Sequence, residues 1–238
     1  MKEEIINGIR YRLNGGTLTA EVIKNNEGCE GEIIIPKTVV FNELTYRVTS
    51  IGEDAFEDCD GLTSIVIPEG VKSIGANAFR GTSLAAVVIP DSMTSIGERA
   101  FAGSCLRSIV IPNSVTSIGE RAFEDCCDLA SVVIPDSVQS IGKYAFHRCT
   151  SLKAISIPNS VMIIEEGAFY RCKSLKIIAI PSNAIIVEKG AFLDCDSLCA
   201  IRYGGTVEQC NRRYRYWDVY SFHNKTVHCI DDDVTIRW

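Results

Sequence analysis

The chain has 238 residues, of which 46% are hydrophobic and 23% are charged, and its formal net charge is −6. This composition agrees with a folded soluble domain. The acidic balance and the lack of a lysine- or arginine-rich stripe argue against a nucleic-acid partner. No run of about 18 apolar residues is present, so the sequence predicts no transmembrane segment.

Residues 1–50 are expected to form an N-terminal β-hairpin cap and a first irregular repeat. The opening segment MKEEIINGIRYRLNGG is polar and lacks the apolar h-region of a secretory signal. As it stands, the chain is therefore expected to stay in the cytoplasm, unless it is a processed form. The segments GIRYRLN and TLTAEVIKN flank Gly15–Gly16, which predicts a hairpin. Pro36 then closes a strand-like run, and the insertion FNELTYR predicts a second hairpin.

A phrase of the form IGxxAF recurs through residues 51–201 at a step of 22 or 23 residues. Self-similarity at this period is typical of a solenoid, in which each repeat stacks only on its neighbours. Its phenylalanines are expected to form a buried spine. They are Phe56, Phe79, Phe101, Phe123, Phe146, Phe169 and Phe192.

One full repeat, residues 129–151, shows what each position does. Residues 129–134 place apolar side chains first, fourth and sixth, and Pro135 ends this run, which predicts one short strand. Val138 and Ile141 are expected to point inward on the return path. Residues 142–146 suit either a turn or a single helical turn.

Eleven cysteines occur, and five of them share one repeat position. Cysteines stacked at the strand spacing have parallel Cβ vectors, which do not suit a disulfide. We expect buried, reduced thiols, and the odd total argues against a secreted disulfide framework. In the two shorter repeats, Gly81 and Gly103 are expected to replace the cysteine. The five cysteines are Cys59, Cys126, Cys149, Cys172 and Cys195.

Residues 202–238 are expected to form a C-terminal cap. Thr206 and Gln209 have the spacing of a capping box that opens a short helix. The pattern HxxxxHC offers three metal ligands, although alternation along a strand would place His228 and Cys229 on opposite faces. An aromatic cluster follows the helix, and a lid over the last repeat is favoured over a binding patch. Its members are Tyr214, Tyr216, Trp217, Tyr220 and Phe222.

The full pattern, LxxIxIPxxVxxIGxxAFxxC, closely resembles the BspA-like class of leucine-rich repeats from Leu62 to Ile201. Glu165 and Glu188 depart from the pattern by replacing its glycine. The resemblance implies a leucine-rich-repeat solenoid that is mainly β with short helical turns. It also implies a curved right-handed solenoid with N- and C-terminal caps, a cell-surface or secreted location, and a role in adhesion or other macromolecular recognition.

The outward side of the repeat strands is the most informative functional feature of the sequence. If the first, fourth and sixth strand positions point inward, the second, third and fifth face solvent. These positions form a nearly uncharged strip of small residues and valines, bordered by a few cations. Exposed apolar patches of this kind often mark partner contacts, although valine also simply suits a solvated strand. The candidate residues are Val66, Val88, Val110, Val133, Arg107, Lys153, Lys176 and Arg202.

Three functional classes follow from these patterns. A non-catalytic module that binds a protein or other macromolecular ligand leads. A purely architectural segment of a larger surface protein is second, and an enzyme is a distant third because no nucleophile–base or metal constellation appears. We therefore expect no catalytic residues, no metal and no cofactor. The recurring acidic residues of the return loops, such as Asp58 and Glu124, are expected to form a solvated face.

Overall fold

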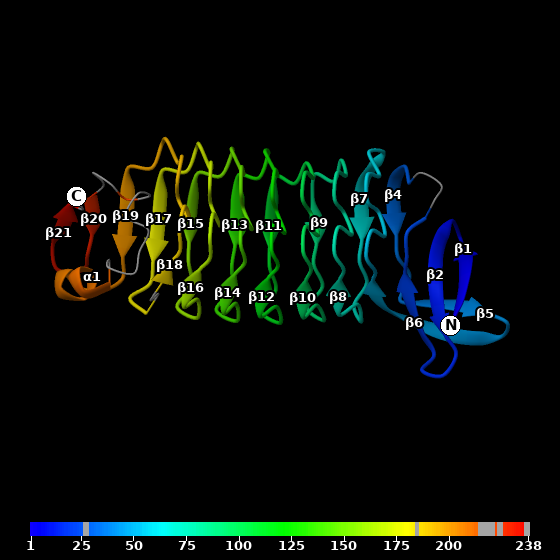
Figure 1. Ribbon diagram of the computed structural model, residues 1–238. Helices are drawn as coiled ribbons and strands as arrows, with labels where there is room; N and C mark the ends of the chain where they lie inside the picture. The colour runs from blue at the N-terminus through cyan, green and yellow to red at the C-terminus, as the bar shows by residue number, and fades with distance from the viewer. Residues whose placement is uncertain (26–28, 184–185, 214–221, 223–225, 236–238) are drawn as a thin grey trace.

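The computed structural model describes residues 1–25, 29–183, 186–213, 222 and 226–235. These residues form a solenoid, an elongated row of coils lying side by side between N-terminal strands at one end and a short helix at the other (Figure 1). Each complete coil contributes one strand to each of two sheet faces. The solenoid expected from the repeat period is therefore confirmed.

The first face is built from the LxxIxI segments. In one of them Leu106, Ile109 and Ile111 are buried while Ser108 and Val110 between them are exposed, as the sequence predicts. Parallel pairing sets equivalent residues of successive repeats beside each other, for example Val110 beside Val133. The strands of this face are β4 (Gly31–Ile34), β7 (Leu62–Val66), β9 (Val87–Val88), β11 (Ser108–Val110), β13 (Ser131–Val133), β15 (Ala154–Ser156), β17 (Ile177–Ile180) and β19 (Ala200–Tyr203).

The second face is a continuous parallel ladder of two-residue strands. In the repeat strands of this ladder the second residue points inward, and the isoleucines at this position, such as Ile118 and Ile141, are almost fully buried. The repeat strands of this face are β8 (Ser73–Ile74), β10 (Ser95–Ile96), β12 (Ser117–Ile118), β14 (Ser140–Ile141), β16 (Ile163–Ile164) and β18 (Ile186–Val187).

The N-terminal segment extends both faces. Its two predicted hairpins are confirmed, because β2 pairs antiparallel with β3 around Gly15–Gly16 and β5 pairs antiparallel with β6. Strand β6 then pairs in parallel with β8, and β4 pairs in parallel with β7 on the first face. The bounds are β1 (Lys2–Ile6), β2 (Ile9–Asn14), β3 (Thr19–Val22), β5 (Thr38–Phe41) and β6 (Leu44–Ile51).

The phenylalanine spine is confirmed. Consecutive rings from Phe56 to Phe192 lie 5.1–5.5 Å apart between centroids and are within 11° of parallel. Each ring is at most 2% exposed. Offset stacking of this kind adds to the free energy that burial of the rings already supplies.

The IGxxAF segments take the turn form rather than the helical form. Each described turn has a left-handed residue before the alanine and another two places after the phenylalanine, as at Arg121 (φ 53°) and Asp125 (φ 56°). This alternation aims every second N–H group at the following repeat, where Phe123 N donates to Ala145 O over 2.8 Å. The turns therefore form a third ladder along the solenoid.

The glycine that opens each turn lets two backbones approach closely. A Cβ atom at Gly119 would lie 2.6 Å from the carbonyl oxygen of Gly97 in the preceding repeat. In the last two repeats Glu165 and Glu188 take this place, and glycine instead occupies the left-handed position at Gly167 and Gly190.

The cysteine column differs from the sequence-based alignment in the two shorter repeats. Gly81 and Gly103 have φ of +68° and hold the left-handed position, so the expectation that they replace the cysteine is wrong. Thr82 and Ser104 fill the cysteine's place and are 2% and 3% exposed. The missing residue thus lies between this buried position and the following leucine, in the loop where shortening does not disturb the turn ladder.

After the last repeat the chain forms α1 (Val207–Arg213), β20 (Thr226–His228) and β21 (Asp233–Thr235). The capping box is confirmed: Gln209 N donates to Thr206 Oγ1 over 3.2 Å, and Thr206 N donates to Gln209 Oε1 over 2.9 Å. Phe222 is buried with its ring 5.5 Å from that of Phe192. The other members of the aromatic cluster lie outside the residues that the structure describes. These are Tyr214, Tyr216, Trp217 and Tyr220.

Candidate functional site

Four valines form a row on the outward side of the first face, which we call the valine row. Val66, Val88, Val110 and Val133 are 46%, 82%, 64% and 56% exposed. Parallel pairing aligns Val66 with Val88 and Val110 with Val133. The solvent-facing fifth strand position predicted from the sequence is therefore correct, and the four side chains occupy it in four consecutive repeats of the solenoid.

The row extends further than the repeat pattern indicates. Ile34 of β4 pairs with Val66 and is 64% exposed, which adds a fifth apolar side chain at the N-terminal end. Ile34 was not predicted from the sequence because the β4–β7 register shifts between Gly31 and Glu32, so the spacing of this first strand departs from the repeat. One pattern in the sequence could have located Ile34, namely the strand-like run that Pro36 closes.

Toward the C-terminus the same position becomes small and then basic. Ser156 pairs with Ala179, and Ala179 pairs with Arg202. The loss of side-chain volume leaves a shallow hollow of about 350 Å³ beside Arg202, also lined by Pro158 and Tyr203. An apolar row thus leads into a hollow that a guanidinium group borders.

Three further cations stand at the second strand position of the same face. Arg107, Lys153 and Lys176 are exposed. Backbone hydrogen bonds keep this column in register, since Lys176 N donates to Lys153 O over 2.8 Å. Within the described part of the chain, neither these three residues nor Arg202 forms an ion pair. Their charges are consequently available to a partner.

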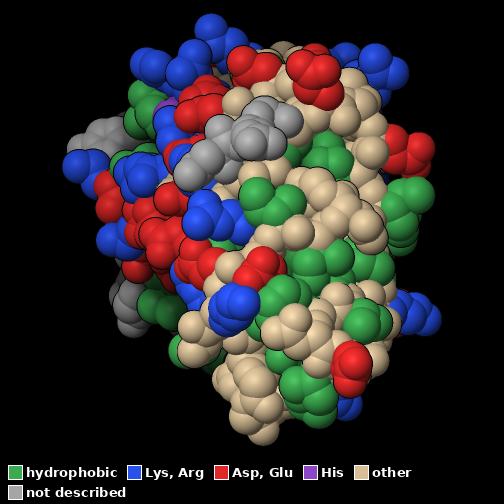
Figure 2. All heavy atoms as spheres, turned by 90° about the vertical axis from the view of Figure 1, so that its right-hand side faces the viewer, with side chains coloured by type: hydrophobic (Ala, Val, Ile, Leu, Met, Phe, Trp, Pro, Cys, Tyr) green, Lys and Arg blue, Asp and Glu red, His purple; other side chains and the backbone are tan. Residues whose placement is uncertain are grey.

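The turn ladder, by contrast, carries charges that neutralise one another. Glu57 pairs with both Lys24 and Arg80, and Glu124 pairs with Arg121 over 3.6 Å. Arg148 pairs with Asp125 over 3.1 Å. Seen from the N-terminal end, acidic and basic side chains are intermixed along one flank, while hydrophobic side chains gather elsewhere (Figure 2). The expected acidic face is therefore partly solvated, since Asp58 is exposed and forms no ion pair within the described residues. It is partly ion-paired, as at Glu57 and Glu124.

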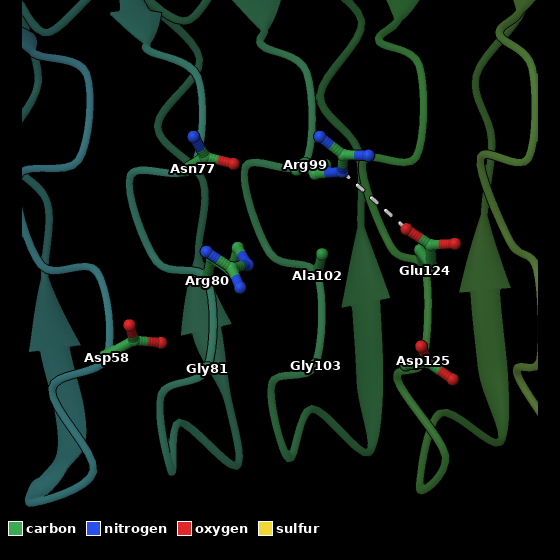
Figure 3. A pocket seen from close by; sticks show the side chains of 9 residues that line it. All are labelled: Asp58, Asn77, Arg80, Gly81, Arg99, Ala102, Gly103, Glu124 and Asp125. Carbon is green, nitrogen blue, oxygen red and sulfur yellow. Dashed lines mark ion pairs between the residues drawn. The ribbon is translucent and has the colours of Figure 1, made fainter.

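A hollow of about 610 Å³ opens on this turn face (Figure 3). Its floor is formed by Gly81, Ala102 and Gly103, because the two shorter repeats place small residues there. Carboxylates and guanidinium groups of both signs surround it, and Arg99 Nε lies 3.8 Å from Glu124 Oε2. Its three carboxylates nearly balance its two guanidinium groups, so the hollow does not strongly concentrate one sign, and it is a weaker candidate than the valine row.

The family is shown by direct comparison of the sequence with known repeats. The BspA type leucine rich repeat region matches in six copies over residues 37–149 and 122–214, which together span most of the chain. The chain belongs to the BspA-type leucine-rich repeat family. No curated protein matches it.

Solved structures of similar fold come from bacteria. A leucine rich cell surface protein from Faecalibacterium prausnitzii is 22% identical, with 90% of this chain and 97% of that chain covered and a TM-score of 0.42. A leucine-rich repeat protein from Bacteroides ovatus is 22% identical, with coverages of 96% and 76% and a TM-score of 0.43. The pneumococcal vaccine antigen PcpA is 13% identical, with coverages of 96% and 98% and a TM-score of 0.51. At these identities the likeness concerns the fold alone.

The described side chains of this BspA-type protein do not support a metal site at the C-terminal pattern HxxxxHC. His228 Nδ1 lies 2.9 Å from Asp233 Oδ1, and Cys229 contacts Cys210 rather than a histidine. His223 lies outside the described residues. Within those residues no group of three or more histidine, cysteine or acidic side chains is placed to hold a metal ion, and no helix there has the length and apolarity to span a membrane.

Proposed function

We propose that this BspA-type leucine-rich repeat protein is a non-catalytic recognition module that binds a protein partner through the valine row. One observation carries the proposal. Val66, Val88, Val110 and Val133 stand exposed at the same strand position of four consecutive repeats, although the other columns of large apolar side chains in the described repeats are directed into the core. Contiguous apolar surface of this kind is typical of contact sites.

Burial of this row would be favourable for a simple reason. Removing apolar area from water contributes roughly 25 cal/mol per Å². The flanking positions are Ser108, Ser131 and Ala86, whose small side chains expose few polar atoms that a partner would have to desolvate. The apolar gain is therefore opposed by little polar cost.

The partner surface is proposed to be acidic. Arg107, Lys153, Lys176 and Arg202 border the row, and none is engaged in an ion pair within the described residues. Complementary charges speed association and select among partners. The hollow beside Arg202 offers a place where a carboxylate side chain of the partner would meet the guanidinium group.

We place this recognition at the cell surface or outside the cell, as the family resemblance implies. Repeat proteins commonly bind through the continuous sheet that successive strands present. No catalytic role is assigned, because the proposed contact surface consists of valine, alanine, serine and a few cations and contains no nucleophile–base pair.

The test introduces charge into the row. Val110→Glu with Val133→Glu places two carboxylates on the proposed contact surface, and both side chains are exposed, so the fold should persist. Thr116→Glu with Gln139→Glu is the matched control, since these exposed residues belong to the same two repeats but flank the second face. Each chain is immobilised at equal density, and the proteins retained from one surface extract are identified by mass spectrometry.

The expected result is a partner that binds the wild-type chain and the control but not the valine variant. A partner that still binds the folded valine variant would refute the valine row as the contact surface. If the wild-type chain retains no partner at all, the recognition proposal fails and the architectural role is favoured instead.

A further inference from the structure

Two cysteines meet at the C-terminal end of the solenoid. Cys210 lies in the first turn of α1, and its N–H donates to Thr206 O over 2.8 Å. The turn after β20 is fastened to the start of this helix, because Ile230 N donates to Gly205 O over 3.1 Å. Cys229 precedes Ile230, so the backbone brings it to the side of α1 that carries Cys210.

A second tether fixes the same arrangement. Val207 N, at the first position of α1, donates to Asp231 Oδ1 over 2.8 Å. Burial and the neighbouring Cys229 raise the pKa of the Cys210 thiol to about 12, so the two thiols lie near each other. Cys210 is fully buried, while Cys229 is partly exposed and packs against the core.

This pair differs from the cysteine column of the repeats. In that column Cys149 donates to Phe123 O and Cys172 to Phe146 O, so each thiol is directed at a backbone oxygen. Equivalent positions in stacked repeats also hold their Cβ vectors parallel, which opposes a bridge. Cys210 lies in a helix and Cys229 directly after a strand, so the repeat does not hold their Cβ vectors parallel.

We propose that Cys210 and Cys229 form a disulfide when the protein meets a disulfide oxidant. The partly exposed Cys229 thiolate attacks one sulfur of oxidised glutathione and releases one glutathione thiolate, which takes up a proton. Cys210 then gives up its proton and attacks the Cys229 sulfur of the mixed disulfide, and the second glutathione leaves as a thiolate that takes up this proton. The protein loses two protons and two electrons in all, and one oxidised glutathione becomes two thiols.

The bridge would bind α1 to the strand that ends the solenoid. It closes a loop that runs from residue 210 to residue 229 and therefore restricts the unfolded chain more than the folded one. For a chain of this length we expect the oxidised protein to unfold about 5–10 °C higher than the reduced protein.

The experiment uses the full chain treated with oxidised glutathione at about pH 8.5, where more of each thiol is ionised. Free thiols are alkylated after denaturation, and the digest is analysed without reduction. The expected product is a cross-linked peptide pair containing Cys210 and Cys229, two hydrogen atoms lighter than the separate peptides. Dithiothreitol should abolish both the cross-link and the rise in unfolding temperature.

Two variants sharpen the result. Cys229→Ser should remove the cross-link and the temperature rise, whereas Cys105→Ser, which removes an exposed thiol in a repeat, should keep both. The wild-type measurement alone decides the matter if a variant fails to fold. Full alkylation of Cys210 and Cys229 after oxidation, a stable glutathione adduct on Cys229, or bridges only between other cysteines would each overturn the proposal.

Discussion

The thiol of Cys149 donates a hydrogen bond to the carbonyl oxygen of Phe123 over 3.2 Å, across the boundary between two repeats. The same contact recurs from Cys126 to Phe101 and from Cys195 to Phe169. The cysteine column therefore joins each repeat to the one before it. Because both groups are buried, a side chain that fills the space without donating leaves the carbonyl oxygen less satisfied.

The first prediction concerns the ionisation of these thiols. Burial raises the pKa of Cys126 to about 12 and those of Cys149 and Cys172 well above the ordinary value. Cysteines in the unfolded chain titrate at about pH 8.5. The stability that these neutral thiols contribute is thus complete below that pH and is lost as the pH rises toward 12.

We expect the free energy of unfolding to fall between about pH 8 and about pH 10 under reducing conditions. Cys126→Ser should make this fall shallower, by up to about 1.4 kcal/mol per pH unit, because one titrating group is removed. Serine suits the column, as Ser104 already occupies it. Urea unfolding at a series of pH values measures both slopes, and equal slopes would contradict the prediction.

The second prediction tests the phenylalanine spine. Phe146→Ala should lower the free energy of unfolding by about 3–5 kcal/mol, because the ring is fully buried and stacks on both Phe123 and Phe169. The exposed Val133→Ala is the control and should change stability by less than about 0.5 kcal/mol. A loss below about 1 kcal/mol for Phe146→Ala in urea unfolding would mean that the spine contributes little.

The third prediction concerns the close approach of the turns. Gly119→Ala places a Cβ atom 2.6 Å from Gly97 O, so the two repeats must move apart. We expect a loss of about 1–3 kcal/mol, the usual cost of overpacking. Gly15→Ala is the control, since a Cβ atom there meets nothing within 4 Å. Thermal unfolding of both variants decides the matter, and equal midpoints would show that the stack can adjust.

The fourth prediction tests whether Arg202 helps to select an acidic partner, separately from the apolar contact that the valine row makes. Arg202→Glu should weaken binding of the partner recovered with the wild-type chain by about tenfold or more and should remove most of its salt dependence. Lys189→Glu makes the same change of charge on the turn face and should leave the affinity unchanged. Dissociation constants at low and high salt supply the measurement. Equal effects of the two variants would assign the change to net charge alone.

Much of the fold was predictable because the repeat imposes one chemistry at each position. Seven phenylalanines in register define the spine, and inward and outward strand positions follow from the alternation of Leu106, Ile109 and Ile111 with their neighbours. The turn form was not predictable from residue types. Left-handed positions are usually glycine, whereas Arg121 and Tyr144 hold such positions here, so their type does not indicate a positive φ. Stacking on the neighbouring turns favours that conformation.

The limits of the site prediction have a similar origin. The fifth column was found because four valines align, whereas Ile34 belongs to a strand whose register shifts. The hollow on the turn face lies over Gly81 and Gly103, which the repeat alignment placed in the cysteine column rather than at the left-handed turn position. Ile34 and the hollow were missed because the repeat is irregular at those places, not because the repeat pattern as a whole is weak.

The turn ladder has a further consequence for how such a protein changes over generations. Phe101 N donates to Ala122 O just as Phe123 N donates to Ala145 O, so each repeat offers its successor the same edge that it receives from its predecessor. A duplication or loss of one whole repeat in the gene leaves every remaining junction chemically unchanged. Each such event lengthens or shortens the exposed row by one strand spacing, about 4.8 Å. Selection can therefore change the length of the exposed row in equal steps without changing the core.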